Sequence, residues 1–187
     1  LGGLGFEPQG VGGFVAQALA LDHPQRVRRL ILASTNFGGP RHLPITAEAM
    51  AVLTDTKSDP LERLRRGIAV STAPGWAEAH PEVVQAWLEY RAAHPLDPAG
   101  YQAQLAVGLG LLAEAACFEP KLANVQAPTL ILAGAHDKVV PPGNADLLAA
   151  RIPDSRVHVL PDAGHLFPFE DPEAANAVIL RFLTLPS

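Results

Sequence analysis

Two side chains in the second half of the sequence have the types and spacing of an acid–base pair. Asp137 lies in the loop after the apolar run TLILA, and His165 lies in the loop after the run RVHVL. If both runs are strands of one open α/β sheet, these loops meet at the edge where such sheets bind ligands. A carboxylate beside an imidazole fixes its tautomer and stabilises its protonated form. The pattern therefore predicts a His–Asp dyad that moves protons.

Each residue of this pair also has an ordinary structural explanation. An Asp after Gly-x-x is a common turn residue, and a single His after Gly is often structural. The dyad is favoured because the two residues follow successive strands in the order that brings them together. His136 is a rival base, but it shares a loop with Asp137 and is therefore less favoured.

The elements that would position the pair alternate as in an α/β fold. Short runs rich in branched aliphatic residues predict buried parallel strands at 28–33, 129–133 and 156–160. Apolar stripes and proline boundaries predict helices at 12–22, 144–151 and 172–183. Asp171 is the expected N-cap of the last of these helices.

The middle of the chain, residues 39–116, contains no convincing strand. Helical runs begin near Thr46, Asp59, His80 and Asp97, and three of these starts precede a proline. A simple crossover between two parallel strands needs only about a dozen residues. We therefore expect 39–116 to be an inserted helical cap, with residues 1–38 and 117–187 forming the core.

Three stretches together resemble small-molecule α/β-hydrolases, a family that includes esterases, enol-lactonases, meta-cleavage hydrolases and haloperoxidase-like proteins. They are the run from Gly12 to Val27 with the following LILAST, the string PTLILAGAHDKVVPP, and the string LPDAGHLFPFEDPEAANAVILRFL. Together they cover roughly the final two-thirds of a typical member. The resemblance implies a partial α/β-hydrolase fold with Asp137 as triad acid and His165 as triad base. It also implies a cap that shapes the pocket for a small ester or lactone, and no metal or organic cofactor.

The resemblance fails at the nucleophile. The family elbow is G-x-S-x-G, and aligning Gly12-Gly13 with its glycines puts Gly10 on the serine. In a second alignment the elbow is deleted, and Gly10 or Val11 marks the join. Both alignments leave no serine, cysteine or aspartate at the elbow. The family's first strands and its His-Gly loop are also missing, so the backbone N–H of Val11 is the one oxyanion donor expected to remain.

Other side chains are poor substitutes for the nucleophile or for a metal ligand set. Ser34 and Thr35 end the first strand, where hydroxyl groups commonly cap turns. Cys117 is expected to pack as a small apolar residue. Core positions in the cap helices are expected for Trp76, Trp87 and Tyr90, and surface or packing positions for His80, His94 and His158.

Composition limits the partners and the compartment. The net charge of −5 gives no support for binding to nucleic acid or to an anionic membrane. No apolar run is long enough to span a bilayer, and a single cysteine excludes an internal disulfide, so we expect a cytoplasmic protein. The start, LGGLGFEP, has no basic region and no initiator Met, which indicates a fragment or a missing start.

Without the family's first strands, the strand at 28–33 would have an open edge, so self-association is expected. Three functional hypotheses remain open at this point. The chain is an inactive member of a hydrolase family, a piece of an active serine hydrolase, or a protein that binds small molecules without turning them over.

Overall fold

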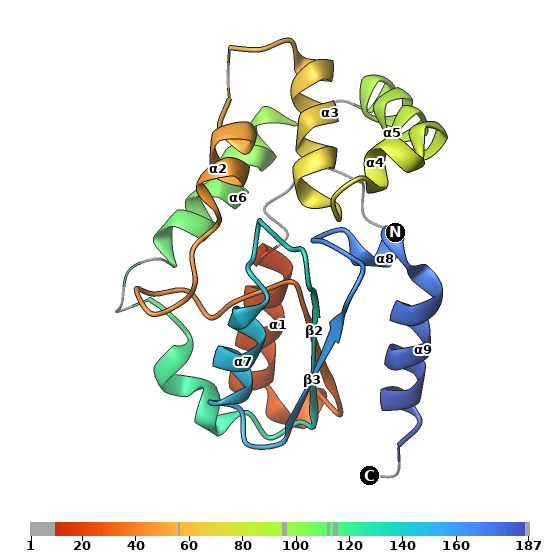
Figure 1. Cartoon of the computed structure of the whole chain (residues 1–187). Helices are drawn as coiled ribbons and strands as arrows, with labels where there is room; N and C mark the ends of the chain where they lie inside the picture. The colour runs from red at the N-terminus through yellow and green to blue at the C-terminus, as the bar shows by residue number, and fades with distance from the viewer. Residues whose placement is uncertain (1–9, 56, 95–96, 112, 114–115, 186–187) are drawn as a thin grey trace.

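A three-stranded parallel sheet is the centre of the fold (Figure 1). The computed structural model describes residues 10–185, apart from residues 56, 95–96, 112 and 114–115. The strands are β1 (Leu30–Ala33), β2 (Thr129–Gly134) and β3 (Ser155–Leu160), in the order β1-β2-β3. The expected strands are confirmed within two residues at each end. Because the sheet is parallel, the loops after β2 and β3 leave the same edge.

Helices cover both faces of this sheet, which explains why β2 is buried along its whole length. One face packs against α1 (Gly10–Asp22), η2 (Glu119–Asn124) and α7 (Gly143–Ala149), through side chains that include Ala20, Leu122 and Leu148. The other face packs against α8 (Phe167–Glu170) and α9 (Pro172–Leu183), through Phe167 and Phe182. Figure 1 shows α1 and α7 on one side of the strands and α9 on the other. The short η1 (Pro24–Arg26) connects α1 to β1.

The segment between β1 and β2 is helical, as expected. It contains α2 (Ala47–Leu53), α3 (Pro60–Ser71), α4 (Trp76–Ala79), α5 (Pro81–Ala93) and α6 (Pro98–Gly110). Thr46 caps α2, and Asp59 caps α3 with Pro60 at its first position, so the predicted starts follow from ordinary capping chemistry. Figure 1 places these helices beyond one end of the strands, next to the loops that follow β2 and β3.

These helices have a small core of their own. Ile68, Val84 and Leu88 are buried together, and Trp87 packs against them. Trp76 stacks on Trp87 with ring centroids 6.0 Å apart. The expected core position of Tyr90 is wrong: its side chain is 41% exposed and stacks on His94. Tyr90 lies two positions after Leu88, which places it on the outer face of α5.

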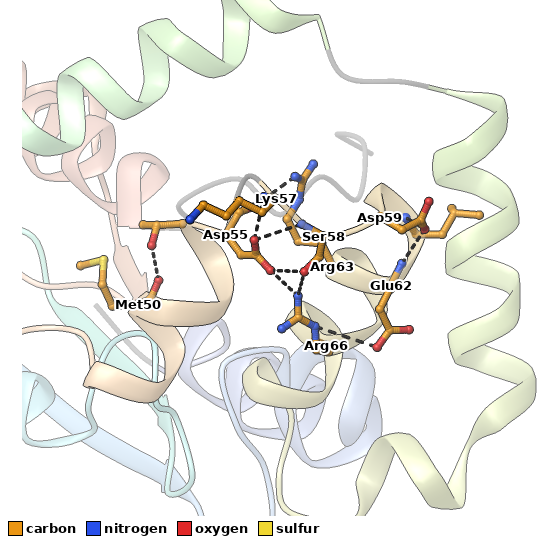
Figure 2. Close-up of polar contacts among 10 residues, drawn as sticks. Met50, Asp55, Lys57, Ser58, Asp59, Glu62, Arg63 and Arg66 are labelled. Atoms are coloured by element: carbon orange, nitrogen blue, oxygen red, sulfur yellow. Dashed lines mark hydrogen bonds and ion pairs between the residues drawn. The ribbon is translucent and has the colours of Figure 1, made fainter.

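A polar cluster stabilises the turn that joins α2 to α3 (Figure 2). The Asp55 carboxylate accepts hydrogen bonds from the Ser58 hydroxyl at 2.5 Å and from the Lys57 backbone N–H at 2.8 Å, and it pairs with Arg66. These hydrogen bonds, led by the one from Ser58, hold the pKa of Asp55 well below its usual range. The cluster is a local turn structure, because the chain's own groups satisfy this carboxylate.

No helix in the described part of the chain is both long and apolar enough to cross a membrane.

Candidate active site

Asp137 and His165, predicted as a dyad, lie in direct contact. The His165 Nδ1 atom is 2.8 Å from Asp137 Oδ2, and each residue is only 3% exposed. The two residues come from the loops after β2 and β3, so the parallel sheet brings them together as expected. Because a carboxylate only accepts hydrogen bonds, Nδ1 carries the proton of the ring and donates a hydrogen bond to Asp137 Oδ2, which leaves Nε2 as the nitrogen that can take up a second proton.

The Asp137 carboxylate is held on its other side by its own loop. Its Oδ1 atom accepts hydrogen bonds from the backbone N–H groups of Val139 at 2.9 Å and Val140 at 2.7 Å. One oxygen is therefore fixed by the backbone, and the other is presented to the imidazole. The carboxylate orients His165 without having to move.

The second ring nitrogen of His165 has different surroundings. Nε2 is buried, and it has no hydrogen-bond partner in the described part of the chain. A buried polar atom without a partner costs about 1–3 kcal/mol, so its position calls for an explanation such as a catalytic role or a bound water. Nε2 is the atom through which a histidine oriented by a carboxylate exchanges protons with a nucleophile or a ligand.

The loops of the dyad pack backbone against backbone. A side chain at Gly134, the last residue of β2, would place its Cβ 2.1 Å from the carbonyl oxygen of Gly164. The His136 N–H donates to the Ala163 carbonyl at 2.9 Å, which ties the two loops together just before the dyad residues. The His136 side chain is exposed, so the rival base lies outside this buried site.

Gly10 and Val11 form the first turn of α1. This turn lies near the carboxyl end of β1, because a Cβ added at Gly13 would meet the Thr35 side chain at 2.1 Å. Thr35 follows Ser34, whose hydroxyl donates to the backbone carbonyl of His165 at 3.5 Å. These contacts connect the start of α1 to the edge of the sheet that carries the dyad. Gly10 has no side chain, and the backbone N–H groups of a first helical turn have no partner within the helix.

The alternative nucleophiles are engaged elsewhere. The Ser34 hydroxyl contacts the backbone oxygen of His165 rather than the imidazole, and Ser34 itself has a positive φ of 44° at the end of β1. Cys117 is 2% exposed, and a Cβ at Gly39 would lie 2.9 Å from its sulfur, so it is packed against the backbone as expected.

His80, His94 and His158 have the surface or packing surroundings expected for them. His80 Nδ1 lies 2.8 Å from the Trp76 carbonyl oxygen, and His94 Nδ1 lies 2.9 Å from the Tyr90 carbonyl oxygen. In both cases the carbonyl belongs to the residue four positions earlier. His158 is exposed on β3. Among the described residues, no three or more His, Cys, Asp or Glu side chains are grouped so that they could hold a metal ion.

One residue of this region is missing from the sequence-based prediction. Glu170, at the end of α8, accepts hydrogen bonds from the Gly164 N–H and from the Ala73 N–H of the α3–α4 turn. Burial, with a smaller effect from the nearby Asp137 charge, raises the pKa of the Glu170 carboxyl. The sequence signal that could have indicated Glu170 is a carboxylate directly after the apolar residues LFPF.

The family comparison identifies the type of fold. Residues 11–172 match a family model described as the alpha/beta hydrolase fold. The matched range includes both dyad loops and begins one residue after Gly10, the first residue of α1.

Curated relatives carry hydrolase names. The chain is 33% identical over 175 residues to a poly(3-hydroxyalkanoate) depolymerase of Ectopseudomonas oleovorans, covering 92% of this chain and 58% of that protein. It is 29% identical over 175 residues to a 2-hydroxy-6-oxononadienedioate/2-hydroxy-6-oxononatrienedioate hydrolase of Cupriavidus pinatubonensis, covering 92% of this chain and 59% of that protein. The chain therefore spans less than two thirds of these relatives.

A solved structure agrees with this assignment. A thermophilic esterase from Thermogutta terrifontis, solved with malate bound, superposes with a TM-score of 0.66 at 29% identity. The alignment covers 92% of this chain and 61% of that one. The fold described above is thus shared with an esterase of which this chain covers 61%.

Proposed function

This chain belongs to the α/β-hydrolase family, and from that premise we propose that it carries the acid and the base of a hydrolytic triad without the nucleophile. Asp137 is the proposed acid and His165 the proposed base. Gly10 occupies the position of the serine, so the chain by itself does not turn over esters or lactones. Residues 39–116 are the proposed cap over this site, and residues 1–38 and 117–187 the proposed core.

The observation that carries this proposal is the asymmetry of the His165 ring. Nδ1 is bound to Asp137 at 2.8 Å, whereas Nε2 is buried without a partner in the described residues. A histidine kept only for packing would have both nitrogens satisfied or solvated. An imidazole oriented on one side and unpaired on the other is prepared to take a proton from a hydroxyl group.

The chemistry follows from the two nitrogens. With a serine at the elbow, Nε2 would remove the hydroxyl proton as the oxygen attacks the substrate carbonyl. Asp137 would stabilise the imidazolium, which then gives its proton to the leaving alcohol. The N–H of Val11 would donate to the carbonyl oxygen as it becomes negative. With Gly10 in place, there is no hydroxyl oxygen to deprotonate, so the reaction stops before its first bond forms.

The substrate class is proposed from the relatives and from the fold. One relative is named for a polyester and another for a dicarboxylic dienoate, and the superposed structure is that of an esterase. A small ester or lactone is the class of substrate that fits a protein of this family with this dyad. The residues of the cap decide which ester or lactone is bound, and such residues differ in position and type among members of a fold.

The proposal is tested by the hydrolysis of short-chain 4-nitrophenyl esters. We expect the chain, its Asp137→Asn variant and its His165→Ala variant to give the same rate as the buffer blank. Turnover by the chain that disappears in either variant would overturn the proposal. Gly10→Ser supplies the gain-of-function arm: labelling at position 10 by a fluorophosphonate, lost when His165→Ala is added, would support the alignment that places serine there.

A second candidate function is the binding of a small molecule without turnover. Its support is that the Ser71 hydroxyl, 1% exposed at the end of α3, also lacks a partner among the described residues. The Ser71 carbonyl binds the Leu166 N–H at 3.1 Å, so this hydroxyl belongs to the region beside His165. Saturable heat of binding for butyrate or for 4-nitrophenyl butyrate, lost in Ser71→Ala, would favour this candidate.

A third candidate is that the chain is part of a longer, active serine hydrolase. The support is that it spans only 58% and 59% of the relatives it matches. The test is the DNA upstream of the first codon. An in-frame strand followed by G-x-S-x-G would favour this candidate, and a stop codon there would exclude it.

A further inference from the structure

We propose that Glu170 is a positioning residue for His165. Its carboxylate holds Gly164, the residue before His165, against Ala73 in the turn between α3 and α4. The helical segment 39–116 would thereby set the place of the imidazole. This inference rests on the proposed function only in calling the imidazole a base.

The contacts of Glu170 reach two separate parts of the chain. Its Oε1 and Oε2 atoms accept from the Gly164 N–H at 2.9 and 3.0 Å, and Oε2 accepts from the Ala73 N–H at 2.6 Å. Gly164 and Ala73 are far apart in sequence, and Glu170 is the side chain that joins them. Charge-assisted hydrogen bonds of this kind are about twice as strong as neutral ones.

The histidine loop lies directly against the α3–α4 turn. A Cβ at Gly164 would lie 2.7 Å from the Thr72 carbonyl carbon and 2.8 Å from the Ser71 carbonyl oxygen. On the far side of His165, the Leu166 N–H donates to that same Ser71 carbonyl at 3.1 Å. The residues before and after His165 are thus both fixed by the end of α3, and Glu170 closes the arrangement.

A ring contact adds to this connection. The Trp87 ring of α5 meets the Phe169 ring of α8 edge-on, with centroids 5.3 Å apart. Phe169 precedes Glu170, so a helix of the inserted segment also contacts the backbone that presents this carboxylate. Movement of these helices would therefore displace Glu170 and, through Gly164, the imidazole.

The Gly164 N–H lies within hydrogen-bonding distance of both Glu170 oxygens, whereas the Ala73 N–H donates to Oε2 alone. The Gly164 and Ala73 N–H groups point at one carboxylate, and a glutamine amide would turn its NH₂ group toward one of these donors. Glu170→Gln keeps the size of the side chain while it removes one acceptor and the charge. It therefore tests the junction without leaving a cavity.

The experiment uses the ¹⁵N-labelled chain and three variants. Glu170→Gln breaks the junction. Glu173→Gln, an exposed carboxylate three residues later, is the control for loss of charge. Phe182→Leu, in the buried cluster under α9, is the control for a general loss of stability. The readouts are the amide hydrogen exchange of Gly164 and Ala73 and the Nδ1–H signal of His165.

We expect Glu170→Gln to speed exchange at both amides by about tenfold or more, since neither amide then donates to a charged group. We also expect the His165 Nδ1–H signal to weaken or shift, whereas both controls leave it in place. Unchanged exchange would show that Glu170 does not form the junction. Faster exchange with an unchanged His165 signal would show that the junction does not position the imidazole. Either result overturns the inference, and neither depends on ester turnover.

Discussion

His165 is a histidine whose two ring nitrogens have opposite surroundings. Nδ1 is held by a carboxylate that the backbone N–H groups of Val139 and Val140 fix in turn, while Nε2 is buried and unpaired in the described residues. Burying Nε2 without a partner costs free energy, and a hydrogen bond from a nucleophile or ligand would offset this cost. At the scale of residues, the site is an oriented base beside a helix that begins with Gly10.

Glu170 gives this region a pH dependence with a definite sign. Burial raises the pKa of its carboxyl above the ordinary value of 4.5, so the folded chain holds this proton more tightly than the unfolded chain does. The stabilising contribution is present below the unfolded pKa and is lost as the pH rises through the folded one. We therefore expect the free energy of unfolding of the chain to fall relative to that of Glu170→Gln just above pH 4.5.

Urea unfolding at a series of pH values measures this difference. The nearby Asp137 charge adds to the upward shift of the Glu170 pKa, whereas the backbone N–H groups of Ala73 and Gly164 oppose it. Glu173→Gln serves as the reference, because its exposed side chain lacks the burial that causes the effect. Parallel stability curves for the chain and Glu170→Gln would show that the carboxyl is not destabilised by burial.

At the scale of elements, the dyad depends on loops that approach each other without intervening side chains. Gly134 ends β2 at the place where the carbonyl groups of Ala163 and Gly164 pass. Gly164 in turn lies against the end of α3. Two glycines thus allow the acid loop, the histidine loop and the inserted helices to meet.

Gly134→Ala is expected to destabilise the chain by about 1–3 kcal/mol or more, because its Cβ would meet backbone atoms at 2.1 and 2.4 Å that cannot rotate away. Gly12→Ala is the matched control. A Cβ there meets nothing within 4 Å, and alanine favours the helix, so we expect no loss and a gain of up to about 0.5 kcal/mol. Thermal unfolding of both variants measures this difference in stability. Equal melting temperatures would show that the two loops do not touch as described.

The elements and the dyad could be predicted from the sequence, because strand loops of a parallel sheet share one edge and capping residues mark the helix starts. The packing between the loops could not be predicted from the sequence. Glu170 sits in an apolar string with no partner nearby in sequence, and its hydrogen bond to Ala73 spans 97 residues. The spacing of Tyr90 from Trp87 predicts a core position wrongly, because this spacing does not decide which face of α5 is covered.

At the scale of the whole molecule, the described sheet has an open edge at β1. β1 pairs with β2 on one side, through hydrogen bonds from the N–H groups of Leu30 and Ser34. Successive residues of a strand point these groups to opposite sides, so the N–H of Ala33 points away from β2. Within the described residues nothing pairs with that side of β1, and open strand edges promote association.

We therefore expect the chain to self-associate, with a sedimentation coefficient that rises with concentration. Ala33→Pro removes the outward N–H and should reduce this association, since proline is tolerated at a strand edge. Ala33→Val keeps the N–H at the same position and should leave association unchanged. A chain that stays monomeric at high concentration, or an equal effect of both substitutions, would count against association through this edge.

We infer that Asp137 orients the His165 ring, so that the neutral imidazole carries its proton on Nδ1 and leaves Nε2 as the basic nitrogen. Long-range ¹H–¹⁵N correlation of the histidine rings near neutral pH reports directly which nitrogen carries the proton. We predict that the neutral form of His165 is protonated at Nδ1 and bare at Nε2, and that Asp137→Asn disturbs this tautomer. A neutral ring with its proton on Nε2, or a His165 spectrum that Asp137→Asn leaves unaltered, would contradict the account.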